Sequence, residues 1–263
     1  MDFWGVHARC GGDSREVREL LKGVQKIQST RKAFAALLAD GTVVSWGDQF
    51  LGGDSSKVQT MLQQVQDIQS SSCSFAAILA NGSVVTWGRR NGGGDSSRVN
   101  GLLQKVQQIQ STSMAFTAVR CDGLAVAWGH PWFGGECISL EGVREVAASH
   151  SSFAAILKQG SVVTWGEPQR GGDSSAVAQE LKGVSQIQAS EGAFAAILSE
   201  RGINVVTWGL PEDGGYSGSV RDQLQNVQQI QAMECCEVEC CVARYSAKLT
   251  LLTLPKKELE RWK

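Results

Sequence analysis

The sequence predicts a mainly β protein, a β-propeller of about six short blades, because two elements recur along it. The first is the dipeptide Trp-Gly, whose tryptophans are spaced by 37 to 43 residues. The second is a strand of the type Phe-Ala-Ala-Ile-Leu, which stands between successive Trp-Gly pairs. A fixed period of this length is typical of proteins built from small, similar units. The units are expected to start near six tryptophans: Trp4, Trp46, Trp87, Trp128, Trp165 and Trp208.

Each unit is expected to contain a three-stranded antiparallel meander. In the second unit, a polar strand around Ile68 precedes the apolar strand at residues 75–80. Asn81-Gly82 then predicts a hairpin, because both residues tolerate a positive φ. The return strand, which ends at Trp87, is rich in the β-branched and aromatic residues that strands favour.

A short helix is expected before the first strand of each unit. Asp54 offers an N-capping oxygen, and apolar residues then follow at i, i+4 and i+7, namely Val58, Leu62 and Val65. The fourth unit, between Trp128 and Trp165, spans only 37 residues. It is therefore expected to lack most of its helix, because about four missing residues make one helical turn.

One such sheet cannot bury both of its faces alone. The paired alanines of the central strand allow a neighbouring sheet to approach closely, and radial stacking supplies that neighbour while leaving few open edges. We expect the tryptophans to pack between the stacked sheets. A solenoid of one helix and one parallel strand per unit is the alternative, and it leaves the Asn81-Gly82 hairpin unexplained.

The domain is expected to cover residues 1–254, followed by a charged tail at 255–263. The sixth unit is regular as far as Ile230, but Glu237 and Leu249 stand where Phe and Trp belong. Residues 1–5 contain an orphan piece of the Trp-Gly strand. We hypothesise that this piece docks beside residues 238–243 and closes the ring, since closure removes exposed sheet edges. The alternative is an open fragment of a larger propeller.

Composition narrows the function classes. A formal net charge of -1 and a pI near 6.3 argue against nucleic acid or an anionic membrane as partner. No apolar run approaches a membrane span of about 18 residues, and no signal peptide is expected at the start. Eight cysteines at irregular spacing favour free thiols in a reducing compartment. We expect a cytoplasmic protein, with a nuclear location as the alternative.

Between Trp-Gly and a following Gly-Gly, five units keep four residues and change all of them. The turn before the Phe strand varies as well, and both places are expected at the end of the sheet opposite the hairpin. Variable residues on a fixed frame indicate a binding surface, although unconstrained loops would also vary. The large aromatic pair Trp132-Phe133 favours binding. The candidate binding residues are Gln49, Phe50, Arg89, Arg90, His130, Trp132, Phe133, Gln169, Arg170, Glu212 and Asp213.

The order of these elements resembles the repeats of the regulator of chromosome condensation (RCC1-like) family, which also occur in HERC-type ubiquitin ligases. The resemblance covers about residues 1–231 and implies a propeller, a fold that serves many functions. The units here are shorter than is usual in that family, and six are counted where seven are common. The long insertion with which the founding member contacts its GTPase has no counterpart, which argues against nucleotide exchange.

Other motifs give little indication of function. The recurring Gly-Gly-Asp-Ser-Ser element lacks the lysine of a phosphate-binding loop and is explained as a capped turn. The cluster Cys235, Cys236, Cys240 and Cys241 lacks the spacing of a zinc site, so no metal is expected. No catalytic set and no cofactor motif stands out. We therefore expect a non-catalytic scaffold that binds a protein partner. The alternative is a regulatory or substrate-recognition part of an enzyme system, either exchange for a small GTPase or ubiquitin ligation.

Overall fold

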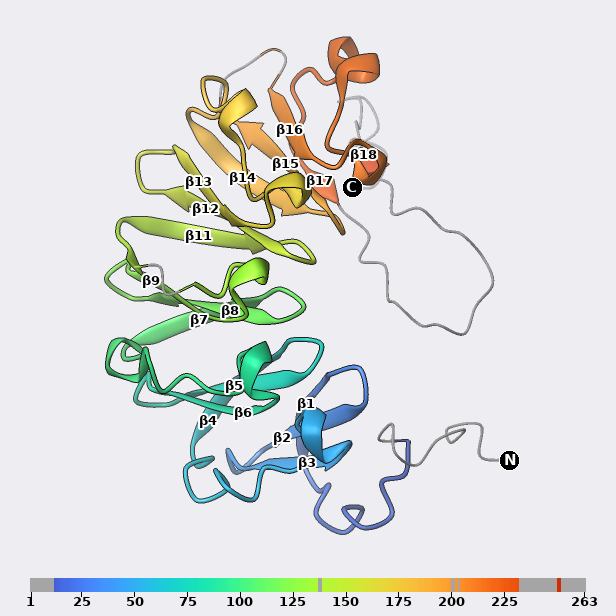
Figure 1. The fold of residues 1–263 in the computed structure, drawn as a ribbon, viewed down its shortest axis with the longest axis vertical. Helices are drawn as coiled ribbons and strands as arrows, with labels where there is room; N and C mark the ends of the chain where they lie inside the picture. The colour runs from blue at the N-terminus through green and yellow to red at the C-terminus, as the bar shows by residue number, and fades with distance from the viewer. Residues whose placement is uncertain (1–11, 137–138, 200–201, 203, 232–249, 252–263) are drawn as a thin grey trace, which may run out of the picture. The chain divides into compact units, whose positions relative to one another are not determined.

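The structure, a computed structural model, describes residues 12–136, 139–199, 202, 204–231 and 250–251. The chain forms two compact units, Met1–Val146 and Ala147–Lys263. Within the described residues the regular structure is almost entirely β, and the remainder consists of turns and short 3-10 helices (Figure 1). The predicted mainly β class is confirmed.

Unit 1 contains three antiparallel sheets in which consecutive strands are neighbours. The third sheet gains a short fourth strand, β10 (Ser139–Leu140), beside β9. The other strands are β1 (Val24–Ser29), β2 (Ala33–Leu38), β3 (Val43–Gly47), β4 (Val65–Ser70), β5 (Ser74–Leu79), β6 (Val84–Gly88), β7 (Val106–Ser111), β8 (Ala115–Arg120) and β9 (Ala125–Gly129).

Unit 2 continues the same pattern. The strand β11 (Val143–Ala148) begins in unit 1 and ends in unit 2, where it forms a sheet with β12 (Ser152–Leu157) and β13 (Val162–Gly166). The next sheet contains β14 (Val184–Ala189), β15 (Ala193–Leu198) and β16 (Val205–Gly209). Of a sixth sheet, the described residues include two-residue strands only, β17 (Ile230–Gln231) paired with β18 (Thr250–Leu251).

The predicted hairpins are present, with one difference at the turn. In the second sheet the Leu79 N–H donates to Ser83 O at 2.9 Å, which closes a three-residue loop. Gly82 has a φ of 77°, whereas Asn81 accepts a hydrogen bond from the Ser83 N–H through its side-chain oxygen. The loop is therefore a turn followed by a left-handed glycine, so only the glycine needs a positive φ.

The expected helix is replaced by turns. The Leu62 N–H reaches Val58 O at 3.2 Å, but Val65 already belongs to β4. Gln64 has a φ of 55° and turns the chain into the strand before a helix can continue. Leu62 is nonetheless buried. The regular spacing of Val58, Leu62 and Val65 therefore arises from contact with the sheet and not from a helix. In later units the segment contains the 3-10 helices η4 (Asn100–Leu102), η7 (Ser175–Val177) and η9 (Gly218–Gln223).

The shorter fourth unit has a short strand in this segment. Residues 137–138 lie outside the described residues, and the next two residues form β10, with Ser139 opposite Val126 and Leu140 opposite Ala125. The described part of this segment is thus a strand. Because the other units also lack the expected helix in their described residues, the shorter spacing does not correspond to a lost helical turn.

Three tryptophans join their sheet to the preceding repeat of the same unit. In unit 1 the Trp87 Nε1–H donates to Gly52 O at 3.1 Å, and the Trp128 Nε1–H donates to Gly93 O at 3.0 Å. In unit 2 the Trp208 Nε1–H donates to Gly171 O at 3.1 Å. Each indole also stacks on the phenylalanine opposite it in its own sheet. Packing between neighbouring sheets is thereby confirmed for these tryptophans, and it is the contact that adjacent propeller blades make.

The first sheet differs from its equivalents in one respect. Ile27 is 54% exposed, whereas Ile68 and Ile109 at the same place in the next two sheets are buried. Among the described residues of unit 1, no preceding sheet covers this face. The hypothesis that residues 1–5 dock beside residues 238–243 concerns segments outside the described residues, as does the cysteine cluster at Cys235.

Replacement of Trp87 by alanine tests the role of the indole. The side chain is buried, and the substitution removes a stacked ring and a hydrogen bond between sheets. We expect the free energy of unfolding to fall by about 3–5 kcal/mol, as for other buried aromatics. Urea denaturation measures the change. Trp132→Ala, at a tryptophan outside the repeat frame, is the control, and equal midpoints for the two variants would contradict the assignment.

Candidate functional site

The variable four-residue segments form a series of short 3-10 turns. Each turn starts just after Trp-Gly and ends at a glycine with a positive φ, for example Gly52 with 99° after η2. The turns are η2 (Gln49–Leu51), η3 (Arg90–Gly92) and η5 (Pro131–Phe133) in unit 1, and η6 (Pro168–Arg170) and η8 (Pro211–Asp213) in unit 2.

In three of the turns the closing glycine, Gly52, Gly93 or Gly171, lies against the phenylalanine of the next sheet. A Cβ on Gly52 would come within 2.6 Å of the Phe75 ring, and one on Gly171 within 2.5 Å of the Phe194 ring. Only glycine fits, both because φ is positive and because no space is left. The Gly-Gly element is therefore a packing requirement between sheets, which supports its interpretation as a structural turn.

A hydroxyl group fixes each variable segment from the other side. The Thr30 Oγ1–H donates to Leu51 O at 3.0 Å and the Thr112 Oγ1–H to Phe133 O at 2.9 Å. In unit 2 the Ser190 Oγ–H donates to Asp213 O at 2.7 Å. These bonds confirm that the turn before the Phe strand and the segment after Trp-Gly lie at the same end of the sheet. We name this end the rim. Sequence reasoning missed these anchors, although their position is Ser or Thr in all five units.

Two grooves lie on the rim side of unit 1. The first, of about 530 Å³, is lined by Gln49, Phe50, Arg89 and Arg90 among others. The second, of about 740 Å³, is lined by Arg90 and His130, next to Trp132. Phe50 is 73% exposed and Trp132 is 62% exposed. Five candidate residues thus line the adjoining grooves. Phe133 packs edge-on to the His130 ring, with 5.4 Å between the ring centroids.

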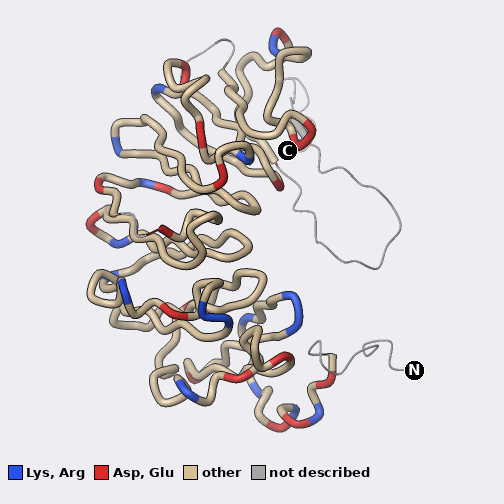
Figure 2. Tube along the Cα trace, in the orientation of Figure 1, with Lys and Arg blue, Asp and Glu red and all other residues tan. Residues whose placement is uncertain are grey.

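The rim of unit 1 is rich in positive charge, and Figure 2 marks Lys and Arg in blue along the trace. Its turns carry four cationic side chains, Arg31, Lys32, Arg89 and Arg90, and one carboxylate, Asp48. Asp48 caps its own turn by accepting from the backbone N–H groups of Phe50 and Leu51. The negative charge of Asp48 therefore serves the loop, whereas most of the positive charge faces solvent.

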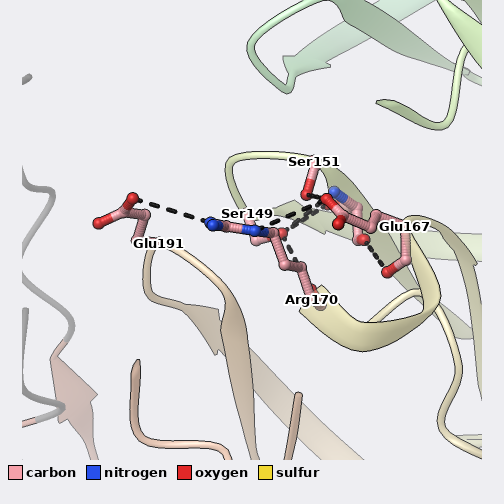
Figure 3. Close-up of polar contacts among 6 residues, drawn as sticks. Ser149, Ser151, Glu167, Arg170 and Glu191 are labelled. Carbon is pink, nitrogen blue, oxygen red and sulfur yellow. Dashed lines mark hydrogen bonds and ion pairs between the residues drawn. The ribbon is translucent and has the colours of Figure 1, made fainter. Parts of the chain in front are cut away.

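The rim of unit 2 carries an ion-pair network instead. Arg170 lies between two carboxylates, 3.6 Å from Glu167 through Nε and 3.7 Å from Glu191 through a terminal nitrogen (Figure 3). Glu167 also accepts a hydrogen bond of 2.9 Å from the Ser151 hydroxyl (Figure 3). The structure therefore brings the candidate Arg170 together with two acidic residues that the sequence did not single out. The candidates Gln169 and Glu212 are exposed.

Asp213 is the titrating group of this rim whose surroundings disfavour its charge. Burial raises the pKa of its carboxyl above the ordinary value, the negative charge of Glu191 raises it further, and the positive charge of Arg170 opposes the shift. Gly192 has no side chain, so the Asp213 carboxylate lies directly against it. A Cβ added at Gly192 would clash with Asp213 Oδ2.

Among the described residues, neither a membrane-spanning helix nor a metal-binding cluster is found. These residues contain 3-10 helices of three to six residues, far from the length of about 20 that a bilayer-spanning helix needs. In the same described ranges no three His, Cys, Asp or Glu side chains gather as a metal site would require. Cys73 is buried and Cys121 is exposed, and both are free thiols.

Stacked three-stranded antiparallel meanders of this kind define the β-propeller class. No protein-family model matches the chain, and no curated protein matches it in sequence. Among solved structures it is similar to human WBSCR16, with 17% identity and a TM-score of 0.46 over 71% of this chain and 61% of the other.

Two further similar structures are of the same yeast protein. One is Prp20p from Saccharomyces cerevisiae, described with its binding to Gsp1p and histones (17% identity, TM-score 0.47, 74% of this chain and 60% of the other). The other is yeast RCC1 (Prp20) bound to Kap60 (18% identity, TM-score 0.49, 75% and 59%). The chain therefore spans about three fifths of the length of the structures it matches. At these identities the similarity concerns the fold alone.

Replacing Gly52 by alanine tests how the rim is fixed. The new Cβ would meet the Phe75 ring at a backbone φ of 99°. We expect the free energy of unfolding to fall by about 1–3 kcal/mol, the usual cost of such backbone strain, with further loss from the clash. Gly101→Ala is the control, because nothing lies within 4 Å of its added Cβ. Equal losses in urea denaturation would argue against the packing role.

The raised pKa of Asp213 predicts a pH-dependent stability. The Asp213 carboxyl binds its proton more tightly in the folded state than in the unfolded chain. Its contribution to the free energy of unfolding is therefore fully present below the ordinary pKa of 3.8 and is lost as pH rises through the raised pKa. We expect Asp213→Asn to unfold at higher urea than the parent at pH 7, and the difference to shrink towards pH 4. Glu212→Gln, in the same turn, is the charge-matched control. A difference that does not vary with pH would contradict this cause.

Proposed function

We propose that the chain is a non-catalytic scaffold that binds a protein partner through its rim loops. The observation that carries this proposal is the contrast between the fixed frame of each loop and its varied content. Gly52 and the Thr30 hydroxyl hold the first loop, and equivalent groups hold the others, while the four residues between differ in charge and size. A rigid frame that presents different side chains costs little entropy on binding.

Exposed aromatic residues support binding further. Phe50 and Trp132 place large apolar areas in water beside charged groups, and aromatic side chains are the commonest energetic centres of protein interfaces. Among the described residues, Ser151 donates directly to a carboxylate, without an intervening histidine that would activate it as a nucleophile. Nucleotide exchange on a small GTPase and recognition of ubiquitin-ligase substrates are narrower forms of this proposal.

Capture of partners from cell extract tests the proposal. We expect the double variant Phe50→Ala, Trp132→Ala to lose its partners, with a loss in affinity of at least about 30-fold if these aromatics act as hot spots. The matched control is Met61→Ala, Leu102→Ala, which removes two exposed apolar side chains of the same unit away from the rim. Quantitative mass spectrometry of the captured proteins provides the measurement.

If both double variants capture the same proteins as the parent, the rim is not the binding surface. A nucleotide-release assay with purified small GTPases tests the narrower exchange activity. If the added chain does not raise the rate of nucleotide release, exchange is excluded for the GTPases tested. The scaffold function then remains as the proposal.

A further inference from the structure

The two grooves of unit 1 occupy equivalent positions one repeat apart. The first lies between η2 and the strand end at Trp87, Gly88 and Arg89. The second lies between η3 and the strand end at Trp128, Gly129 and His130. Arg90 lines both grooves, so they adjoin. A partner segment that follows the rim of this unit would therefore meet the same kind of groove twice.

Three carboxylates line these grooves: Asp54 in the first, and Asp95 and the exposed Glu136 in the second. Asp54 and Asp95 are engaged in their own turns. Asp54 accepts a hydrogen bond of 2.9 Å from the Ser56 N–H. Asp95 accepts one of 3.0 Å from the Ser97 N–H and another of 2.7 Å from Arg90 Nε. The Ser56 N–H holds the pKa of the Asp54 carboxyl below its ordinary value, and the Ser97 hydroxyl and N–H do the same for the pKa of Asp95. Both carboxylates are therefore engaged within their own turns.

Two arginines of the same grooves are available to a ligand. Arg89 lines the first groove and Arg98 the second, and both are exposed. Within the described part of the chain, no hydrogen bond or ion pair to a carboxylate is found for either. An arginine in this state is suited to a bidentate bond with a carboxylate, and partial shielding in a groove strengthens such a bond.

Apolar contacts stand beside both arginines. Phe50 lines the first groove, and Trp132 follows Pro131, which lines the second. The first groove thus combines an exposed aromatic with an arginine, and in the second an exposed aromatic follows a lining residue in the sequence. The matching ligand carries carboxylates interspersed with apolar side chains.

We propose that the two grooves together bind an extended acidic segment of a partner protein, with its carboxylates at Arg89 and Arg98 and its apolar side chains at Phe50 and Trp132. This inference rests on the proposed scaffold function and specifies the chemistry of the partner. A nucleic acid is also anionic, but phosphate-driven binding draws on many cations, and the chain as a whole has a net charge of -1. The arginines together with Phe50 in the first groove and Trp132 beside the second favour the peptide.

Selection from a library of random 12-residue peptides displayed on phage tests the proposal with the full chain as bait. We expect peptides enriched in Asp and Glu together with Leu, Phe or Trp. The same selection on Arg89→Glu, Arg98→Glu should lose this enrichment. Lys158→Glu, Lys182→Glu, which reverses two exposed charges of unit 2, is the matched control and should keep it.

One enriched peptide is then synthesised with a fluorescent label, and its affinity for the chain is measured by fluorescence anisotropy. We expect the dissociation constant to rise at least tenfold on the Arg89, Arg98 variant and to stay unchanged on the control. Added salt should weaken binding by the parent, because exposed charges are screened at a Debye length of about 10 Å in 0.1 M salt.

Three results would overturn the proposal: no acidic enrichment, equal affinity of the parent and the Arg89, Arg98 variant, or displacement of the peptide by a 12-nucleotide single-stranded DNA at lower concentration than by unlabelled peptide. The outcome is separable from that of the scaffold proposal. If the Phe50, Trp132 variant loses its cellular partners while no acidic peptide is selected, the scaffold stands and the acidic ligand is wrong. If acidic peptides bind but the Phe50, Trp132 variant captures the same cellular partners as the parent, the scaffold proposal fails at these loops.

Discussion

The contact between a tryptophan and the glycine of the preceding repeat organises this molecule. The Trp87 indole donates to Gly52 O, and the same glycine leaves room for the Phe75 ring, which stacks 5.2 Å from that indole. Gly52 also ends the turn η2, so one residue takes part in both the core and the rim. The two sequence marks, Trp-Gly and Gly-Gly, are the two sides of one interaction between sheets. Core packing therefore sets where each rim loop starts and ends, and only the residues between are free to vary.

The freedom of those residues produces different chemistry in the two units. In unit 1 the loops present Phe50, Arg89 and Trp132 to solvent. The nearby carboxylates of Asp54 and Asp95 accept hydrogen bonds from backbone N–H groups of their own turns. In unit 2 Arg170 is held between Glu167 and Glu191, so its charge is neutralised inside the rim. The same backbone frame carries both arrangements, since the hydroxyl anchors and left-handed glycines contact the loops through backbone atoms. A frame of that kind allows side chains to change without a large cost in folding.

Sequence reasoning predicted what the repeat controls. The period, the hairpin at Gly82 and the tryptophan packing each depend on contacts within one unit or with the next, and these are visible as recurrent residues. The expected helix failed because Val58 and Leu62 satisfy the spacing of a helix while contacting the sheet from a series of turns, which Gln64 ends in a left-handed conformation. The ion pairs of Arg170 escaped prediction for another reason. Glu191 comes from a neighbouring sheet and occurs once, so no periodic signal marks it. The Ser and Thr anchors did recur, and comparison of the units at that position would have revealed them.

Backbone hydrogen bonds tie successive sheets at the hairpin end and at the rim end, but the two ends differ in the side chains that they carry. At the hairpin end, the Val65 N–H donates to Gly41 O and the Val106 N–H donates to Gly82 O, so successive sheets are tied directly by backbone bonds. That end has few side chains to vary, because a left-handed glycine and a strand start occupy it. At the rim, the Arg31 N–H donates to Ser72 O at 3.0 Å and the Ser72 N–H to Ser113 O at 2.9 Å, so the turns before the Phe strands are tied in the same way. The segments after Trp-Gly lie outside these bonds, and their residues differ from unit to unit. A surface for recognition requires side chains that differ and a backbone that does not move, and in this fold the rim end meets both conditions.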